Sequence, residues 1–152
     1  MDKHFYESPL GTLEICANEE GLLSISFWDD VQNKDMESSD NEHIISCISQ
    51  LDEYFTGVRH EFDIPLIFKG TEFQNKVWRE LLNIPFGEIR SYQQIATAIG
   101  NPKSVRAVGA ANGKNPITII VPCHRVIGAD GNLIGYGGGL WRKKWLLDHE
   151  KI

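Results

Sequence analysis

The chain has 152 residues, enough for one mid-sized domain or two small ones, and its 41% hydrophobic and 24% charged residues are typical of a soluble globular protein. No apolar run approaches the roughly 20 residues of a membrane span. The N-terminal stretch MDKHFYESPLG lacks the apolar core of a signal peptide. A membrane-spanning or secreted protein is therefore not expected.

The charge is unevenly distributed along the chain. The net charge of −6 arises from 3 Lys and Arg against 15 Asp and Glu in residues 1–65, and from 12 against 6 in residues 66–152. Such a split indicates a nucleic-acid surface on the basic half, or two solvated faces that attract each other. The charge alone does not decide between these interpretations.

The three cysteines, Cys16, Cys47 and Cys123, are widely spaced and form no CxxC pair. A disulfide framework or a zinc site built from them is not expected. Reduced thiols, and with them a cytoplasmic location, are the expectation.

The first half predicts a small sheet with one helix. Strand-like runs at KHFYES, TLEICAN and LLSISFW are separated by turn signals and predict an antiparallel meander. The polar, acidic residues 29–43 predict a loop. The segment that follows predicts a helix that ends at Gly57. Its expected buried face consists of Ile44, Ile45, Ile48, Leu51 and Phe55.

The second half predicts helices. Two capping-box patterns, Thr71-x-x-Gln74 and Ser91-x-x-Gln94, predict helices that begin just after the Thr and the Ser. Asn101 as an N-cap predicts a third helix almost at once. Short helices joined by a tight turn are typical of a helix-turn-helix, although helical hairpins also occur in cores. The residues expected to be buried are Phe73, Val77, Trp78, Leu81 and Leu82 on the first helix, and Ile95, Ala98 and Ile99 on the second.

The third helix is unusual in composition. After Arg106 comes Ala-Val-Gly-Ala-Ala, which is poor in the long polar side chains that contact base edges in a major groove. Small residues favour close approach of the helix backbone to a minor groove, with Arg106 inserted between bases. They equally favour tight packing on a neighbouring helix, with Arg106 solvated.

The stretch IIVPCHRVIG, residues 119–128, places reactive side chains where an apolar pattern is interrupted. Ile119 to Val121 predict a buried strand, which Pro122 ends because proline cannot donate to a strand ladder. Cys123 needs a base or a positive environment to form a thiolate near neutral pH. His124 could supply that base if the backbone turns after Pro122 or if a water bridges the two side chains.

A third group would have to orient the imidazole of His124. The basic half offers several carboxylates, and the pattern does not choose among them: Glu72, Glu80, Glu88, Asp130, Asp148 and Glu150. A buried inert cysteine beside a hydrogen-bonded core histidine is the alternative interpretation.

PCHRVIG at 122–128, with GKNPI at 113–117 and GYGGGLWRKKWLLDHE at 135–150, resembles the O6-alkylguanine-DNA alkyltransferases. This family is also called the methylated-DNA–protein-cysteine methyltransferases. The similarity extends over the basic half, including FGEIRSYQQIA at 86–96 and NPKSVRAVGAAN at 101–112, whereas the acidic half matches more loosely.

The resemblance implies a role for each matching residue of the reactive site. Cys123 would accept the alkyl group, His124 would take the thiol proton through a water, and Glu150 would orient His124. Asn115 would brace the turn that carries the cysteine. Tyr92 would crowd the target phosphate and assist protonation of the departing guanine.

The same resemblance implies a DNA surface and a base pocket. Arg106 would replace the extruded base in the duplex. The residues that fall where the family touches the DNA backbone are Gln93, Asn101, Gly109 and Ala110. Tyr136 would wall the base pocket and the backbone at Val126 would contact the base edge. Gly137 stands where some members carry a serine that donates to the base.

The expected fold is α+β: a ribonuclease-like antiparallel sheet with a helix in residues 1–65, and a mainly helical, winged-helix-like domain with a helix-turn-helix in residues 66–152. The expected partner is double-stranded DNA that contains O6-alkylguanine, and O4-alkylthymine is a second expected substrate. The resemblance implies a monomer that reacts once, and neither a cofactor nor a metal is expected.

Two rival functions come from other classes. A module that binds lesions without removing them is disfavoured because Cys123 is retained. A cysteine hydrolase that uses Cys123 and His124 is disfavoured by the helix-turn-helix with Arg106.

Overall fold

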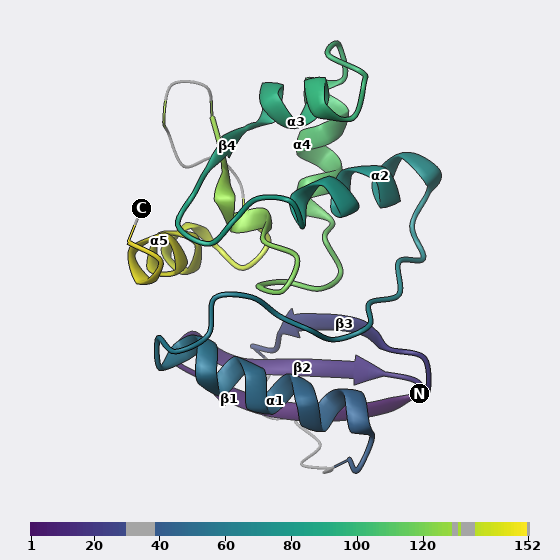
Figure 1. Ribbon diagram of the computed structural model, residues 1–152, viewed down its shortest axis with the longest axis vertical. Helices are drawn as coiled ribbons and strands as arrows, with labels where there is room; N and C mark the ends of the chain where they lie inside the picture. Colours follow the sequence, from purple (N-terminus) through teal and green to yellow (C-terminus); the bar gives the residue numbers. More distant parts are fainter. Residues whose placement is uncertain (30–38, 129–130, 132–135, 152) are drawn as a thin grey trace. The chain divides into compact units, whose positions relative to one another are not determined.

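The computed structural model describes residues 1–29, 39–128, 131 and 136–151. The chain divides into two compact units, Met1–Phe68 and Lys69–Ile152 (Figure 1). None of the helices in these described ranges has the length and apolar character needed to cross a bilayer. An antiparallel sheet in the first unit and helices in the second confirm the predicted α+β class.

The first unit contains the predicted meander. Strands β1 (Asp2–Ser8), β2 (Gly11–Ala17) and β3 (Leu22–Phe27) pair antiparallel in the order β1-β2-β3. The turn before β3 requires glycine, because a Cβ on Gly21 would lie 2.5 Å from the carbonyl oxygen of Pro65. This close approach lets Leu22 donate to Pro65 at 2.9 Å, which ties the segment after the helix to the sheet.

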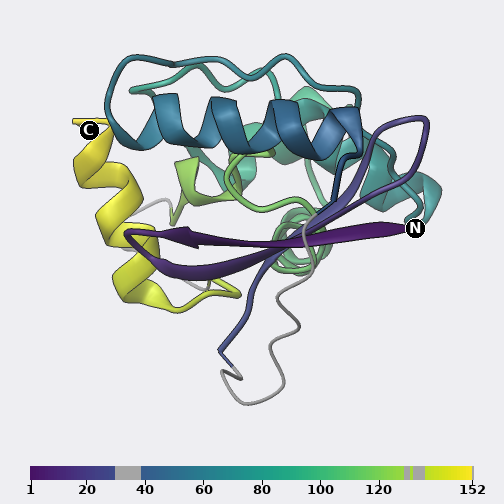
Figure 2. The ribbon, with the colours of Figure 1, turned by 90° about the horizontal axis from the view of Figure 1, so that it is seen from below.

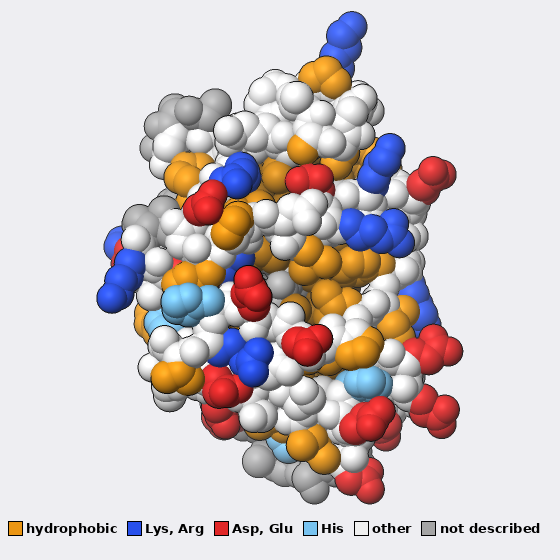
Figure 3. Space-filling model, in the orientation of Figure 1, with side chains coloured by type: hydrophobic (Ala, Val, Ile, Leu, Met, Phe, Trp, Pro, Cys, Tyr) orange, Lys and Arg blue, Asp and Glu red, His pale blue; other side chains and the backbone are white. Residues whose placement is uncertain are grey.

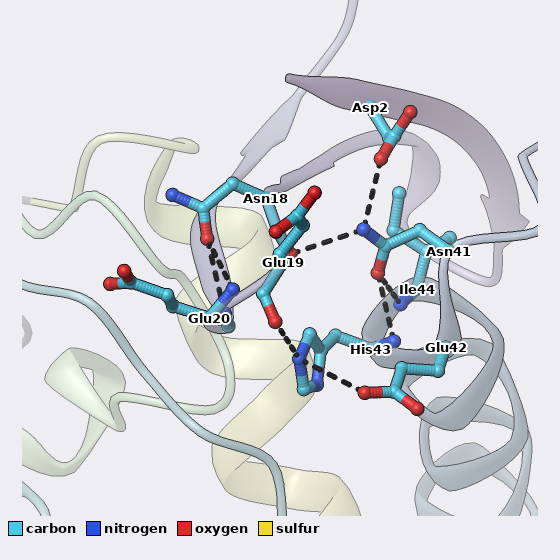
Figure 4. Close-up of polar contacts among 9 residues, drawn as sticks. Asp2, Asn18, Glu19, Glu20, Asn41, Glu42, His43 and Ile44 are labelled. Atoms are coloured by element: carbon cyan, nitrogen blue, oxygen red, sulfur yellow. Dashed lines mark hydrogen bonds and ion pairs between the residues drawn. The ribbon is translucent and has the colours of Figure 1, made fainter.

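Helix α1 (Glu42–Phe55) packs on β1 and β2 and lies across one face of the sheet (Figure 2). Its N-cap, Asn41, uses both ends of its amide (Figure 4). Oδ1 accepts from the backbone of His43 at 2.8 Å, while Nδ2 donates to Asp2 at 3.0 Å and to the carbonyl of Asn18 at 3.1 Å. A single cap residue thus fixes the start of the helix and anchors it to the sheet. The predicted loop at 29–43 lies mostly outside the described residues, and its last two residues belong to the helix.

The buried face of α1 differs in part from the expected one. Ile44, Cys47, Leu51 and Tyr54 are fully buried, whereas Ile45 is 53% exposed, so its predicted burial is wrong. The predicted end at Gly57 is confirmed. Gly57 has φ +87° and follows the C-cap, and the Gly57 and Val58 amides donate back to the last turn, as in a Schellman motif.

The second unit begins with α2 (Glu72–Leu81), whose predicted capping box between Thr71 and Gln74 is confirmed. The indole of Trp78 donates to the carbonyl of Ala111 at 2.8 Å and so joins this helix to α4 (Val105–Gly113). Leu82 is 43% exposed and does not belong to the core, contrary to the prediction, because the helix has ended one residue earlier.

The predicted helix-turn-helix consists of α3 (Tyr92–Ala98) and α4 (Val105–Gly113), which pack on each other. The capping box at Ser91 and Gln94 is confirmed. The buried face of α3 is formed by Ile95 and Ala96 rather than by Ala98, which is exposed.

Asn101 does not start α4. Its carbonyl accepts the backbone amide of Ser104 at 3.0 Å and the hydroxyl of Ser104 at 2.6 Å. These bonds close a separate turn, so the helix begins at Val105 with Ser104 as its N-cap.

A short parallel ladder holds the reactive stretch beside the start of α3. Strand β4 (Arg90–Ser91) pairs with β5 (Val126–Ile127), with Arg90 opposite Val126 and Ser91 opposite Ile127. Tyr92 follows β4 directly, and a single 3₁₀ turn, Cys123–Arg125, precedes β5. Helix α5 (Leu140–His149) packs against that turn and completes the unit.

Candidate active site

The backbone before Cys123 forms turns, so the predicted strand at Ile119–Val121 is wrong. The amide of Val121 donates to the carbonyl of Ile117 at 3.0 Å, and Ile119 has φ +73°. A positive φ is costly for a β-branched residue and persists only where the surroundings impose it. Pro122, at φ −82° and ψ 62°, is the centre of an inverse γ-turn closed by a 2.8 Å bond from Cys123 N to Val121 O.

Cys123 lies at the end of this turn as a free, buried thiol. Asn115 donates from Nδ2 to its sulfur at 3.1 Å and to the carbonyl of Val121 at 2.8 Å, so one amide spans the turn. Asn112, on the last turn of α4, donates to the carbonyl of Cys123 at 3.3 Å. The helix-turn-helix and the turn that carries the cysteine are therefore directly linked.

His124 and Glu150 form a pair that is closed to solvent. His124 Nε2 lies 2.8 Å from Glu150 Oε2, and both side chains have 0% exposure. Burial lowers the pKa of His124 below its usual 6.5, against the opposing influence of Glu150, so the ring is neutral. Since a carboxylate only accepts, Nε2 carries the ring proton and Nδ1 keeps its lone pair. Within the described part of the chain, that buried Nδ1 has no hydrogen-bond partner.

Arg125 holds the other side of the same carboxylate. Its Nε donates to Glu150 Oε1 at 2.7 Å and its Nη2 donates to Oε2 at 3.1 Å. Burial alone would raise the pKa of Glu150, but the hydrogen bonds from His124 and Arg125 together hold that pKa well below its usual range. Glu150 is therefore an anion bound by both His124 and Arg125.

Lys143 is a second cation of the site. Its side chain is fully buried on α5, and Nζ donates to the carbonyl of Val126 at 2.6 Å. Burial lowers the pKa of Lys143 to about 8, while the neighbouring Cys123 acts in the opposite direction. Burial raises the pKa of Cys123, whereas the hydrogen bond from Asn115 and the charge of Lys143 favour the thiolate.

Two tyrosines lie close enough to Cys123 to interact with its charge. Burial and the proximity of Cys123 raise the pKa of both Tyr92 and Tyr136, so both hydroxyls are protonated. The hydroxyl of Tyr136 lies 2.7 Å from Thr118 Oγ1, which also hydrogen-bonds to Cys123. The structure thus brings Tyr92, Tyr136 and Asn115 together around Cys123.

Val126 and Gly137 are the other residues that the sequence predicted for a base pocket. Val126 is fully buried in β5, and its carbonyl already accepts one bond from Lys143. Gly137 is exposed, and a Cβ there would lie 3.6 Å from the carbonyl of Gly113, an ordinary contact. Residue 137 therefore has steric room for a small side chain.

The residues predicted to touch DNA lie on the surface outside this buried cluster, except for Gly109, which borders it. Gln93, Asn101, Arg106 and Ala110 are exposed along α3, the turn after it and α4, and Gly109 is half-buried against Tyr92. Figure 3 shows basic side chains on the surface of the helices α2 to α4 and mostly acidic ones over the N-terminal unit. Met1–Phe68 holds 3 Lys and Arg against 15 Asp and Glu, and Lys69–Ile152 holds 12 against 6.

Four residues of the site were not predicted from the sequence: Asn112, Thr118, Arg125 and Lys143. The burial of Lys143 could have been predicted from its spacing. It lies three and four residues before the apolar Leu146 and Leu147 and so shares their helix face. Arg125 contacts Glu150 across 25 residues, and no local pattern indicates such a pairing. No group of three His, Cys, Asp or Glu side chains in the described ranges could hold a metal ion.

Comparison with known proteins identifies the family. A model described as 6-O-methylguanine DNA methyltransferase, ribonuclease-like domain, matches residues 1–68, and one described as 6-O-methylguanine DNA methyltransferase, DNA binding domain, matches residues 72–152. The chain belongs to the 6-O-methylguanine DNA methyltransferase family, which confirms the resemblance found in the sequence.

Similar proteins cover nearly the whole chain. A methylated-DNA–protein-cysteine methyltransferase of Mycobacterium leprae is 50% identical over 147 residues, which are 95% of this chain and 89% of that protein. One of Methanosarcina acetivorans is 49% identical over 148 residues, or 95% of each chain. The crystal structure of Mycobacterium tuberculosis OGT in complex with DNA superimposes with a TM-score of 0.88 at 46% identity, covering 98% of this chain and 92% of that one.

Proposed function

We propose that this chain repairs DNA by direct reversal, as a methylated-DNA–protein-cysteine methyltransferase that moves an alkyl group from O6 of guanine to Cys123. The observation that carries the proposal is the buried set of Cys123, His124 and Glu150 linked to a helix-turn-helix through Asn112. Relatives that are 50% and 49% identical carry the name of this activity, and the similar M. tuberculosis protein was crystallised with DNA.

The reaction is a one-step displacement. The Cys123 thiolate donates an electron pair to the alkyl carbon, an S–C bond forms, and the C–O6 bond breaks with its electrons on guanine. Guanine regains a proton on its ring, and the tyrosine hydroxyl of Tyr92 beside Cys123 is suited to assist. Soft sulfur attacks this carbon well, and the resulting thioether is stable, so each molecule reacts once.

The proton of the thiol needs an acceptor. The neutral His124 has its Nε2 proton directed at Glu150 and its Nδ1 lone pair available. In the described residues no hydrogen bond joins Cys123 and His124 directly, so the proton passes through a water in this proposal. Glu150 orients the ring and stabilises the imidazolium that forms.

The substrate carbon is inaccessible inside a stacked duplex, so the nucleotide must rotate out at a cost of a few kcal/mol. Arg106 is exposed near the start of α4 and is the long side chain available to fill the gap. Gln93, Asn101, Gly109 and Ala110 would contact the DNA backbone around it. The flipped base would lie between Tyr136 and the Val126 backbone, beside Gly137.

The proposed partner is duplex DNA that contains O6-alkylguanine, with O4-alkylthymine as a second substrate. We further propose that the chain works as a monomer in the cytoplasm, where reducing conditions keep thiols free. All three cysteines are free in the structure, which suits such a compartment.

The decisive experiment is to incubate the protein with a duplex oligonucleotide bearing one O6-methylguanine and to measure the mass of the intact protein. We expect the mass to rise by one methyl group, at most one per molecule, and on the peptide that contains Cys123. Cys123→Ala should bind the same duplex and gain nothing. Binding without any mass gain by the wild type would indicate a lesion-binding module. Removal of more than one methyl group per protein molecule would indicate a hydrolase.

A further inference from the structure

Arg125 makes three buried hydrogen bonds, and two of them go to the carboxylate of Glu150. Nε and Nη2 reach the two oxygens of Glu150 at 2.7 and 3.1 Å, and Nη1 reaches the carbonyl of Ile84 at 2.7 Å. The side chain of Arg125 is 7% exposed and that of Glu150 is 0% exposed. This is the two-pronged geometry by which a guanidinium fixes a carboxylate in one orientation.

The same contacts determine which oxygen faces His124. Oε1 accepts from Arg125 Nε at 2.7 Å, while Oε2 accepts from both Arg125 Nη2 at 3.1 Å and His124 Nε2 at 2.8 Å. A carboxylate held at both oxygens cannot rotate away from the ring. The His124 ring is in turn held by its Nε2, so that its Nδ1 points away from Glu150.

The charges around His124 come from three residues. Glu150 follows α5, Arg125 belongs to the 3₁₀ turn, and Lys143 lies on α5, with the Cys123 thiol next to the ring in sequence. Glu150 favours a charged His124, whereas Arg125 and Lys143 disfavour it. Without Arg125, Glu150 would be a buried anion with His124 as its main counter-charge, and such a pair retains a proton to higher pH.

We infer that Arg125 is a positioning residue of alkyl transfer: it clamps Glu150 against His124 and balances its charge, so that His124 stays neutral with Nδ1 ready to accept the thiol proton. This inference rests on the proposed function. A purely structural role, in which Arg125 only ties the turn to Ile84, is the competing explanation.

The transfer rate measured against pH separates the two explanations. In Arg125→Gln the His124–Glu150 pair should keep its extra proton, on His124, to higher pH. The acid limb of the profile, where the rate falls as the pH is lowered, should therefore move to higher pH. If the limb moves by one pH unit, the rate below the limb falls about tenfold more than the rate on the plateau. A merely structural loss would lower the rate by the same factor at every pH, and that outcome overturns the inference.

Arg125→Lys retains the charge but cannot clamp both oxygens. We expect the limb to stay at the wild-type pH while the plateau rate falls. In the double variant Arg125→Gln/Glu150→Gln, the upward shift of the limb should be absent, because there is no carboxylate left to hold the proton. A limb that moves in the double variant as it does in Arg125→Gln would show that Arg125 does not act through Glu150.

Arg59 provides the matched control, because it makes the same kinds of bond at the surface of the other unit. Its Nε donates to Glu53 at 3.0 Å and its Nη1 donates to the carbonyl of Glu61 at 2.9 Å. Arg59→Gln should leave both the limb and the plateau unchanged.

A measurement without substrate keeps the inference separate from the proposed function. The ¹⁵N NMR chemical shifts of the His124 ring nitrogens in the free protein report its tautomer and its protonation. We expect a neutral ring with the proton on Nε2 in the wild type and in Arg125→Lys, and protonation at higher pH in Arg125→Gln. Unchanged His124 titration in Arg125→Gln would overturn the inference. Failure of the wild type to gain an alkyl group would instead contradict the proposed function.

Discussion

His124 and Glu150, separated by 26 positions in the chain, are joined by a 2.8 Å hydrogen bond between Nε2 and Oε2. The bond links the turn that carries Cys123 to the C-cap of α5. Since both side chains are closed to solvent, the bond fixes the ring and also connects two parts of the second unit.

The substitution Glu150→Gln tests both roles of this bond. It retains the shape but removes the charge, so Arg125 becomes a buried cation without its carboxylate. Breaking a buried pair in this way costs about 3–5 kcal/mol of the free energy of unfolding. We expect slower alkyl transfer, with a deficit that shrinks at high pH, where the thiolate forms without a base. Denaturant unfolding and the transfer rate against pH are the measurements.

Asp148→Asn is the control, because Asp148 pairs with Lys144 at 2.7 Å on the exposed face of the same helix. It should change the free energy of unfolding by no more than about 1 kcal/mol. Equal effects of the two substitutions would mean that the Glu150 contact is no stronger than a surface ion pair.

Stability should fall as the pH is lowered, and the two partners should contribute in separate windows. The pKa of His124 is lowered in the folded protein, so unfolding is favoured once the unfolded chain takes up a proton below about pH 6.5. The pKa of Glu150 is also lowered, so its stabilisation is complete above about pH 4.3 and is lost below it. Unfolding midpoints measured from pH 7 to pH 3 should fall in both windows, and Glu150→Gln should remove the lower one. A midpoint that stays constant down to pH 4 would contradict the assigned protonation states.

The features predicted correctly from the sequence are those set by neighbouring residues. The capping boxes at Thr71 and Ser91, and the helix stop at Gly57, each depend on side chains and dihedral angles within a few positions. The antiparallel meander follows from short strands separated by tight turns. Cys123, His124 and Glu150 were predicted from the family motif rather than from local pattern; the structure pairs His124 with Glu150 beside the buried Cys123, and their roles in the reaction stay predictions.

The errors arose where distant contacts decide the backbone. Ile119 to Val121 are apolar and β-branched, yet Asn115 bonds to Val121 O and to the Cys123 sulfur and draws the chain into turns. Lys143 donates to Val126 across 17 positions, and a lysine is not expected in a core without such a partner. Asn101 has the residue type of an N-cap, but its carbonyl is bound by Ser104 in a separate turn.

Arg106→Ala should slow the repair of duplex DNA far more than the reaction with free O6-benzylguanine. In the proposed mechanism only the duplex requires a base to be extruded and replaced, and Arg106, exposed on α4, is the side chain proposed to take its place. The duplex reaction should also weaken with added salt, because basic side chains displace counterions from phosphates. Rates on both substrates are the measurement, with Arg59→Ala on the other unit as the control. A similar loss on both substrates would show that Arg106 supports the fold.

Trp78→Phe should destabilise the protein by about 1–3 kcal/mol, because the carbonyl of Ala111 would lose a buried donor. The phenyl ring retains much of the packing, so the loss reports mainly on the 2.8 Å bond between α2 and α4. Trp141→Phe is the control, since Trp141 is 58% exposed. Denaturant midpoints distinguish the two, and equal midpoints for both variants would show that the bond adds little.

Lys143→Met should make Cys123 less reactive toward iodoacetamide near neutral pH. The charge of Lys143 favours the thiolate, and methionine fills the buried space of the lysine stem without that charge. The pKa of Lys143 is about 8, so the charge is present below that pH and fades above it. The Cys123 of the variant should therefore react more slowly than that of the wild type at pH 7 and at nearly the same rate at pH 9.

The exposed neighbour Lys144 provides the control: Lys144→Met should follow the wild-type profile. Modification of the Cys123 peptide, followed by mass spectrometry across this pH range, measures the effect. Coincident profiles for Lys143→Met and the wild type would mean that the hydrogen bonds to Cys123, rather than the lysine charge, favour the thiolate.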